Sequence, residues 1–190
     1  MGGNMIIKKL LFYLFAPSLI IITLLLVSIT LNVGSKEGKI VLNRPIESLV
    51  FNDYKQEKLL LFFGYAGCLD VCTPKLETLA KIYSKLPAES QKKVGLLFVN
   101  LSHLEDPNSA DIFAKAFHPD FEGLYLSKPI LTALQREFQI YMAPSLNKKD
   151  EYDHTAFVYL LEKTQSGFKV NAIYTDNILS RDLILTDLKG

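Results

Sequence analysis

The sequence predicts an α/β fold, and three observations lead to this prediction. Residues 59–63 and 94–99 are short apolar runs without alternation, as in strands that are buried on both faces of a sheet. Between them, apolar residues recur at helical spacing over 76–86. A strand, a helix and a second strand form a β-α-β unit, which should be parallel and right-handed. Further along, residues 156–161 and 168–174 have the composition of an antiparallel pair of strands.

The first part of the predicted domain has the pattern of a β-hairpin. Residues 40–42 and 46–51 have strand-like composition, and the turn-forming residues 43–45 interrupt them. We therefore expect a hairpin extension in front of the β-α-β unit.

Further helices are predicted after the second buried strand. Residues 106–107 and 127–129 each contain a proline in a helix-start pattern. A short strand or extended link is expected at 123–126, a polar loop at 143–150 and a last helix at 180–188. This order of elements, with the hairpin, the β-α-β unit, a helix, two antiparallel strands and a final helix, is that of a thioredoxin-like domain.

Composition and charge limit the classes of function and partner that the chain can have. The chain has 190 residues, of which 49% are hydrophobic and 22% charged, which suits one globular domain plus a more apolar segment. The net charge is +1, and no long basic run is present. Nucleic acid is therefore not expected as a partner.

The apolar segment is at the N-terminus. Residues 10–31 carry no charged side chain and are long enough, at about 20 residues, to cross a bilayer as a helix. Lys8 and Lys9 precede them, so the positive-inside rule places residues 1–9 in the cytoplasm. We expect a single-pass anchor, a linker over 32–39 and a domain over 40–190 that faces the periplasm or an equivalent space. A cleaved signal peptide is the alternative, but the apolar run is longer than its usual apolar region.

Both cysteines, Cys68 and Cys72, lie in the loop that joins the first buried strand to the helix. Thr73 is a candidate N-cap for this helix, and Pro74 suits its first position. The amide dipoles of a helix N-terminus favour a thiolate over a thiol. The thiolate is the form that attacks disulfides and binds soft metals.

The C-x-x-x-C spacing of Cys68 and Cys72 admits two kinds of chemistry. The two sulfurs could form a reversible disulfide, or they could chelate Cu(I) as two soft thiolates. A structural disulfide or a pair of inert core thiols is the functionless alternative. A closed zinc site is a weaker fit, because it needs four nitrogen or sulfur ligands and the chain has two cysteines and three histidines.

Several segments resemble the Sco/SenC family. They are FFGY at 62–65, CLDVC at 68–72, FHP at 117–119 and EYDHTAFVYL at 151–160. The resemblance implies a membrane-anchored, thioredoxin-like copper protein that serves assembly of the CuA centre of cytochrome c oxidase. It also implies that Cys68, Cys72 and His154 are the metal ligands.

Two thiolates and one imidazole form a set that suits Cu(I) and, with a fourth ligand, can hold Cu(II). The implied partners are the oxidase subunit that carries CuA or another copper acceptor, a thiol reductant, and the membrane through the N-terminal helix. In an oxidising compartment, the cysteine pair needs such a reductant before it can bind copper.

The sequence departs from the family pattern at two places. Ala66, Gly67 and Leu69 stand where the family usually has Thr, often His, and Pro around the first cysteine. Ser102 stands where the family tends to have an Asp, and His103 next to it is either a substitute ligand or a solvated loop residue.

Two functions from different classes follow from these residues. The first is a copper metallochaperone, which needs Cys68, Cys72 and His154. The second is a thiol-disulfide oxidoreductase that keeps partner cysteines reduced, in which Cys68 and Cys72 are the catalytic redox pair and the histidine is not needed. A membrane-tethered domain without either activity is a third possibility.

Overall fold

The computed structural model describes residues 15, 17–24, 35–36, 38–102, 106–145 and 152–189. The chain divides into two compact units, Met1–Lys36 and Glu37–Gly190. In the first unit, residues 17–24 are helical with exposed side chains, and Ser35–Lys36 form strand β1.

None of the helices in the described part of the chain has both the length and the apolar character that crossing a membrane requires. The predicted anchor over 10–31 lies mostly outside the described residues, and the predicted cytoplasmic segment 1–9 lies wholly outside them. Of the predicted linker 32–39, the described residues cover only a part.

The second unit contains the α/β domain. In chain order, its elements are β2 (Lys39–Pro45), the 3-10 helix η1 (Leu49–Phe51), β3 (Lys58–Gly64), α2 (Cys72–Tyr83), α3 (Ala88–Gln91), β4 (Val94–Asn100), α4 (Ser109–Lys115), β5 (Phe121–Leu124), α5 (Lys128–Glu137), β6 (Met142–Pro144), β7 (Tyr152–His154), β8 (Val158–Thr164), β9 (Gly167–Tyr174) and α6 (Arg181–Lys189).

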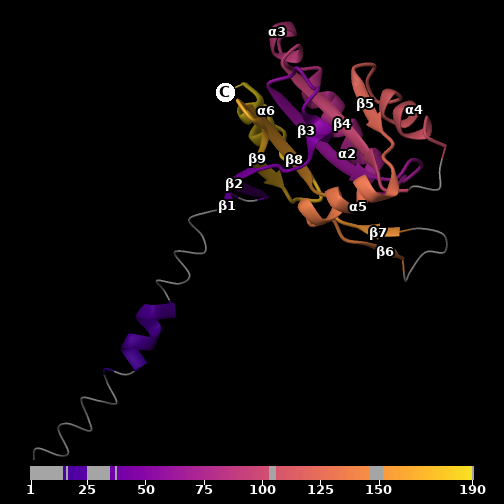
Figure 1. Cartoon of the computed structure of the whole chain (residues 1–190). Coiled ribbons are helices and arrows are strands. Elements are labelled where there is room, and N and C mark those ends of the chain that lie inside the picture. The colour runs from indigo at the N-terminus through magenta and orange to yellow at the C-terminus, as the bar shows by residue number, and fades with distance from the viewer. Residues whose placement is uncertain are drawn as a thin grey trace, which may run out of the picture. The chain divides into compact units, whose positions relative to one another are not determined.

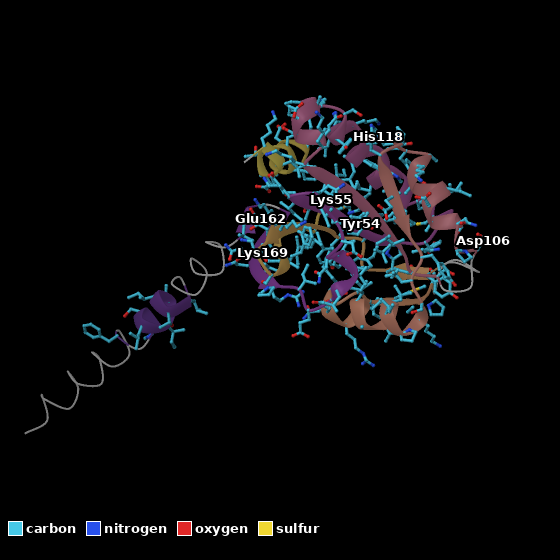
Figure 2. All side chains as sticks on the ribbon, turned by 45° about the horizontal axis from the view of Figure 1, so that its top comes forward. Tyr54, Lys55, Asp106, His118, Glu162 and Lys169 are labelled. Carbon is cyan, nitrogen blue, oxygen red and sulfur yellow. The ribbon has the colours of Figure 1, made fainter. Side chains whose placement is uncertain are left out.

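The strands of the domain form one main sheet in the order β2-β9-β8-β3-β4-β5 (Figure 1). Strand β3 pairs in parallel with β4 and antiparallel with β8, which confirms the predicted β-α-β unit and the predicted antiparallel pair β8 and β9. Glu162 and Lys169 face each other across β8 and β9, and their charged groups lie 3.1 Å apart (Figure 2). Strands β6 and β7 form a separate two-stranded antiparallel sheet.

The alternation of side chains along β3 divides the core into two layers. Leu60 and Phe62 belong to a hydrophobic cluster that includes buried residues of α2, α4 and α6. Leu59, Leu61 and Phe63 belong to a second cluster with η1 and α5 on the opposite face. Because successive side chains of a strand point to opposite faces, a fully apolar strand can serve both layers. The thioredoxin-like fold predicted from the sequence is thus observed, with helices on both faces of a mixed sheet.

The predicted N-terminal hairpin of residues 40–42 with 46–51 is wrong. Strand β2 pairs with β9 instead, and Leu49–Phe51 form the 3-10 helix η1. The hydroxyl of Ser48 accepts the N–H of Val50 at 3.3 Å and caps this turn. Phe51 is fully buried, with its ring centroid 6.1 Å from that of Phe138. Burial of this one aromatic ring favours a turn at a place where composition alone suggested a strand.

The predicted loop over 143–150 is also partly wrong. Its first residues continue β6, which pairs with β7 so that Met142 is opposite His154. Of the segment that joins the two strands, residues 146–151 lie outside the described residues. The short helix α3 was not predicted either, because it has only four residues and no apolar periodicity.

Candidate metal centre

The loop that carries the cysteines begins with a tight turn. Strand β3 ends at Gly64, and the N–H of Cys68 donates to the carbonyl of Tyr65 at 3.2 Å. Gly67 has a φ of +85°, the value that the third residue of a type II turn requires. Glycine suits this position because residues with a side chain adopt a positive φ only with strain.

The helix α2 begins at Cys72, one residue before the predicted N-cap. Thr73 was predicted to cap the helix, and that prediction is wrong: the N-cap residue is Val71, which provides no side-chain cap. The N–H and the hydroxyl of Thr73 both donate to the carbonyl of Cys68, at 3.2 and 3.0 Å. Thr73 therefore closes the loop between the two cysteines, and Cys72 lies in the first helical turn, where backbone N–H groups lack helical partners.

Gly64 allows the sulfur of Cys72 to lie directly against the end of β3. A Cβ atom at this position would lie 2.6 Å from the Sγ of Cys72 and 2.9 Å from the ring of Phe98. These distances are shorter than van der Waals contacts, so any side chain here would displace the sulfur or the ring. A glycine at the end of a buried strand is a sequence signal for such a close approach, although its role here emerged only from the structure.

His154 reaches the cysteines from the hairpin β6–β7. Its Nε2 lies 3.6 Å from the Sγ of Cys72. Its Nδ1 lies 3.1 Å from the carbonyl oxygen of Thr155, and because a carbonyl only accepts, Nδ1 carries the proton in this contact. In the neutral imidazole the lone pair is then on Nε2, the atom that faces the sulfur.

The sulfurs of Cys68 and Cys72 and a ring nitrogen of His154 all lie within 4.8 Å of one another. Neither cysteine is part of a disulfide. An ion with three ligands in a plane, at metal–ligand distances of about 2.3 Å, needs ligand atoms about 4 Å apart. The cluster therefore fits one small, thiophilic ion. Within the described residues, no other group of three or more His, Cys, Asp or Glu side chains has such an arrangement.

The two cysteines differ in protonation. The hydrogen bond from the Cys72 thiol lowers the pKa of Cys68, and hydrogen bonds from the N–H groups of Cys72 and Val71 lower it further, although burial opposes them. The pKa of Cys72 is raised, because its proton is held by Cys68 and because the site is desolvated. In the metal-free protein, these interactions favour the thiolate at Cys68 and the thiol at Cys72.

Alkylation should reveal this difference. Because the pKa of Cys68 is below its ordinary value, Cys68 remains a thiolate as the pH falls, and its rate of reaction with iodoacetamide should change little between pH 8 and pH 6. An ordinary cysteine slows about tenfold per pH unit below its pKa of about 8.5. Cys72 has no exposed surface and should stay unmodified. Timed labelling of the reduced, metal-free chain with mass spectrometry measures both rates, and a tenfold loss per pH unit at Cys68 would contradict the assignment.

Of the other polar residues singled out from the sequence, Ser102 and His118 are described by the structure, and neither belongs to the cluster. The N–H of Ser102 donates to the side chain of Asn100 at 3.1 Å, and Ser102 lines a neighbouring pocket with residues of α5. His103 lies outside the described residues. His118, labelled in Figure 2, packs its ring at 4.8 Å from that of Tyr83.

Comparison with known proteins finds a family model over the part of the chain that carries the cluster. The family model described as SCO1/SenC matches residues 47–183, which include the whole cluster. This chain belongs to the SCO1/SenC family. The solution structure of apo Sco1 from Thermus thermophilus is 31% identical, with a TM-score of 0.60, over 80% of this chain and 89% of that one.

Other SCO1/SenC proteins show the same fold. The structure of Bradyrhizobium japonicum ScoI with copper bound is 24% identical, with a TM-score of 0.57, over 70% of this chain and 83% of that one. Among curated relatives, mouse SCO2 homolog is 30% identical over 57% of this chain and 45% of its own length. The SCO2-like protein RP587 of Rickettsia prowazekii is 26% identical over 74% of this chain and 73% of its own length. The chain thus spans about half the length of the mitochondrial relatives.

Proposed function

We propose that this SCO1/SenC domain is a copper metallochaperone that holds one copper ion through Cys68, Cys72 and His154. The observation that carries the proposal is the convergence of two sulfurs and one imidazole nitrogen within 4.8 Å. Soft thiolates select Cu(I), and an imidazole nitrogen adds a ligand that both copper oxidation states accept. Copper is here the cargo of the protein.

Transfer of the ion would proceed by ligand exchange at the mouth of the site. Cys72 is fully buried and Cys68 is 6% exposed, so an incoming ligand reaches the ion from the side of Cys68. Leu69 and Val71, between the two cysteines, are 74% and 39% exposed. An acceptor protein that exchanges ligands with the ion has to contact these two side chains. Because both side chains are apolar, they fit an acceptor whose own copper ligands are surrounded by an apolar surface.

The acceptor we propose is the cytochrome c oxidase subunit that carries CuA, and the supporting observation is membership of the SCO1/SenC family. We further propose that residues 10–31 anchor the chain in the membrane, with the domain in the periplasm or an equivalent oxidising space. A thiol reductant would then keep Cys68 and Cys72 in the dithiol state. Extraction of membranes at alkaline pH tests the anchor: the full chain should stay in the pellet, and its release as a shortened soluble form would contradict the anchor.

A thiol-disulfide oxidoreductase is the second candidate, and the unequal protonation of the cysteines favours it. The Cys68 thiolate would attack a partner disulfide, form a mixed disulfide and release one partner thiolate. Cys72, after losing its proton, would attack Cys68, release the second partner thiolate and leave a Cys68–Cys72 disulfide. Two electrons pass to the partner, and His154 takes no part.

Copper transfer tests the proposed function. The reduced full chain should bind one equivalent of Cu(I) and pass it to a metal-free, reduced CuA domain, with a rise of the CuA absorption after oxidation. The oxidised chain, with its cysteines joined, is the control and should bind no Cu(I). If the reduced chain binds no Cu(I) yet reduces disulfides of the same CuA domain, the oxidoreductase function replaces the chaperone function.

A further inference from the structure

Tyr65 touches all three residues of the cluster, although it supplies none of the three ligand atoms. Its carbonyl oxygen accepts the N–H of Cys68 at 3.2 Å. Its backbone lies close enough to the sulfur of Cys72 to lower the pKa of that thiol. Its ring lies edge-on to the imidazole of His154, with the ring centroids 5.8 Å apart and the planes at 77°. This residue therefore connects the cysteine loop with the strand that carries the histidine.

The ring of Tyr65 makes a second contact with the same strand. Tyr152 and His154 are two residues apart on β7, and side chains with this spacing lie on the same face of a strand. The ring centroids of Tyr65 and Tyr152 lie 6.3 Å apart, with the planes at 73°. Edge-to-face pairs of this kind have a preferred orientation, so they restrict the rotation of the rings that form them. Two neighbouring side chains of β7 are thus held by one ring from the cysteine loop.

The hairpin β6–β7 is held in the domain by side-chain contacts, which include Met142 of β6 against the second hydrophobic cluster and the rings of Tyr152 and His154 against Tyr65. Its two strands form a sheet of their own, which Figure 1 shows beside α5 and separate from the main sheet. At its base, the N–H of Thr155 donates to the carbonyl of Tyr141 and the N–H of Tyr141 to the hydroxyl of Thr155, both at 3.0 Å. These bonds fix the two strands to each other. They do not fix the distance from His154 to the cysteines.

We propose that Tyr65 is a positioning residue whose ring holds the hairpin β6–β7 against the cysteine loop and so sets the imidazole of His154 beside the two sulfurs. The Thr155 carbonyl determines which ring nitrogen of His154 is free, and Tyr65 determines where that nitrogen lies. The consequence for copper rests on the proposed function, whereas the consequence for the hairpin does not.

Copper affinity provides the first test, on the full reduced chain. Tyr65→Leu removes the ring and should weaken Cu(II) binding about tenfold or more, as the loss of a residue that orients a metal ligand does. Tyr65→Phe keeps the ring and should bind Cu(II) as the parent chain does. Tyr141→Leu is the matched control, because this tyrosine lies at the base of the same hairpin and is 65% exposed, so the substitution should leave Cu(II) affinity unchanged. In a His154→Ala background, Tyr65→Leu should cause no further loss, because the two residues act as a unit.

Amide hydrogen exchange in the metal-free chain provides the second test. Tyr65→Leu should speed the exchange of the His154 and Thr155 amides, while amides of β3 and β4 keep their protection. If Tyr65→Leu does not fold, Tyr152→Leu removes the neighbouring ring, which is 42% exposed, and should speed the same amides.

The outcomes of these tests distinguish the positioning role of Tyr65 from the proposed copper function. Faster hairpin exchange in a chain that binds no copper would support the positioning role and overturn the copper function. Unchanged exchange and unchanged Cu(II) affinity in Tyr65→Leu, in a parent chain that binds copper, would overturn the positioning role alone. Equal losses in Tyr65→Phe and Tyr65→Leu would also overturn it, since the hydroxyl and not the ring would then be responsible.

Discussion

Replacing Cys72 with alanine should weaken Cu(I) binding by on the order of 1,000-fold or more, beyond the 10–100-fold that loss of an outer-shell partner costs. The reason is that a site of three ligands loses one of its two soft thiolates, and the remaining thiolate and imidazole cannot compete for Cu(I). Cys72 is also the innermost ligand, fully buried against Gly64, so water cannot replace it easily. Competition with a Cu(I) chelator at fixed pH measures the loss.

Cys68→Ala should have an effect of similar size, because it removes the other thiolate. Circular dichroism of both variants controls for unfolding, and Ser84→Ala, at the far end of α2, is the matched variant that should bind Cu(I) normally. Cu(I) affinity that survives the loss of either cysteine would exclude this site.

Replacing His154 with alanine should weaken the binding of Cu(II) much more than the binding of Cu(I). Cu(II) needs nitrogen ligands beside thiolates, so its affinity should fall sharply, whereas two thiolates still hold Cu(I) and its affinity should fall less. The same variant should reduce a model disulfide at nearly the parent rate, because the attacking group is the Cys68 thiolate. Chelator competition in both oxidation states, together with a disulfide-reduction assay, measures the three quantities.

His118→Ala is the matched control for this histidine. Its ring packs on Tyr83 and Phe121 and lies outside the cluster, so this substitution should leave binding of both copper states unchanged. Loss of Cu(II) in His118→Ala together with its retention in His154→Ala would show that the third ligand was assigned to the wrong residue.

The position of the two cysteines in the fold could be predicted because they lie between segments with strong local signals. Cys68 and Cys72 follow an apolar strand, and the helix after them has clear periodicity. The parallel pairing of β3 and β4 then follows from the order of the elements alone. His154, by contrast, was predicted from the family resemblance, since one histidine near a strand does not by itself indicate a ligand.

The features that could not be predicted depend on specific contacts that composition and periodicity do not encode. Residues 49–51 look like a strand in composition, but the Ser48 cap and the burial of Phe51 against Phe138, far along the chain, favour a turn. The start of α2 at Cys72 depends on the hydroxyl of Thr73 finding the Cys68 carbonyl and not its own helix. The contact of Tyr65 with His154 joins residues from two elements whose separation no local pattern specifies.

X-ray absorption at the copper edge of the Cu(I)-loaded, reduced chain tests the central claim most directly, because it reports the atoms bound to the ion. The proposal predicts one copper per chain with two sulfur ligands and one imidazole nitrogen, and the loss of the imidazole signal in His154→Ala. A spectrum with sulfur ligands only in the parent chain, or with nitrogen and oxygen ligands and no sulfur, would contradict the assignment of Cys68, Cys72 and His154 as the copper site.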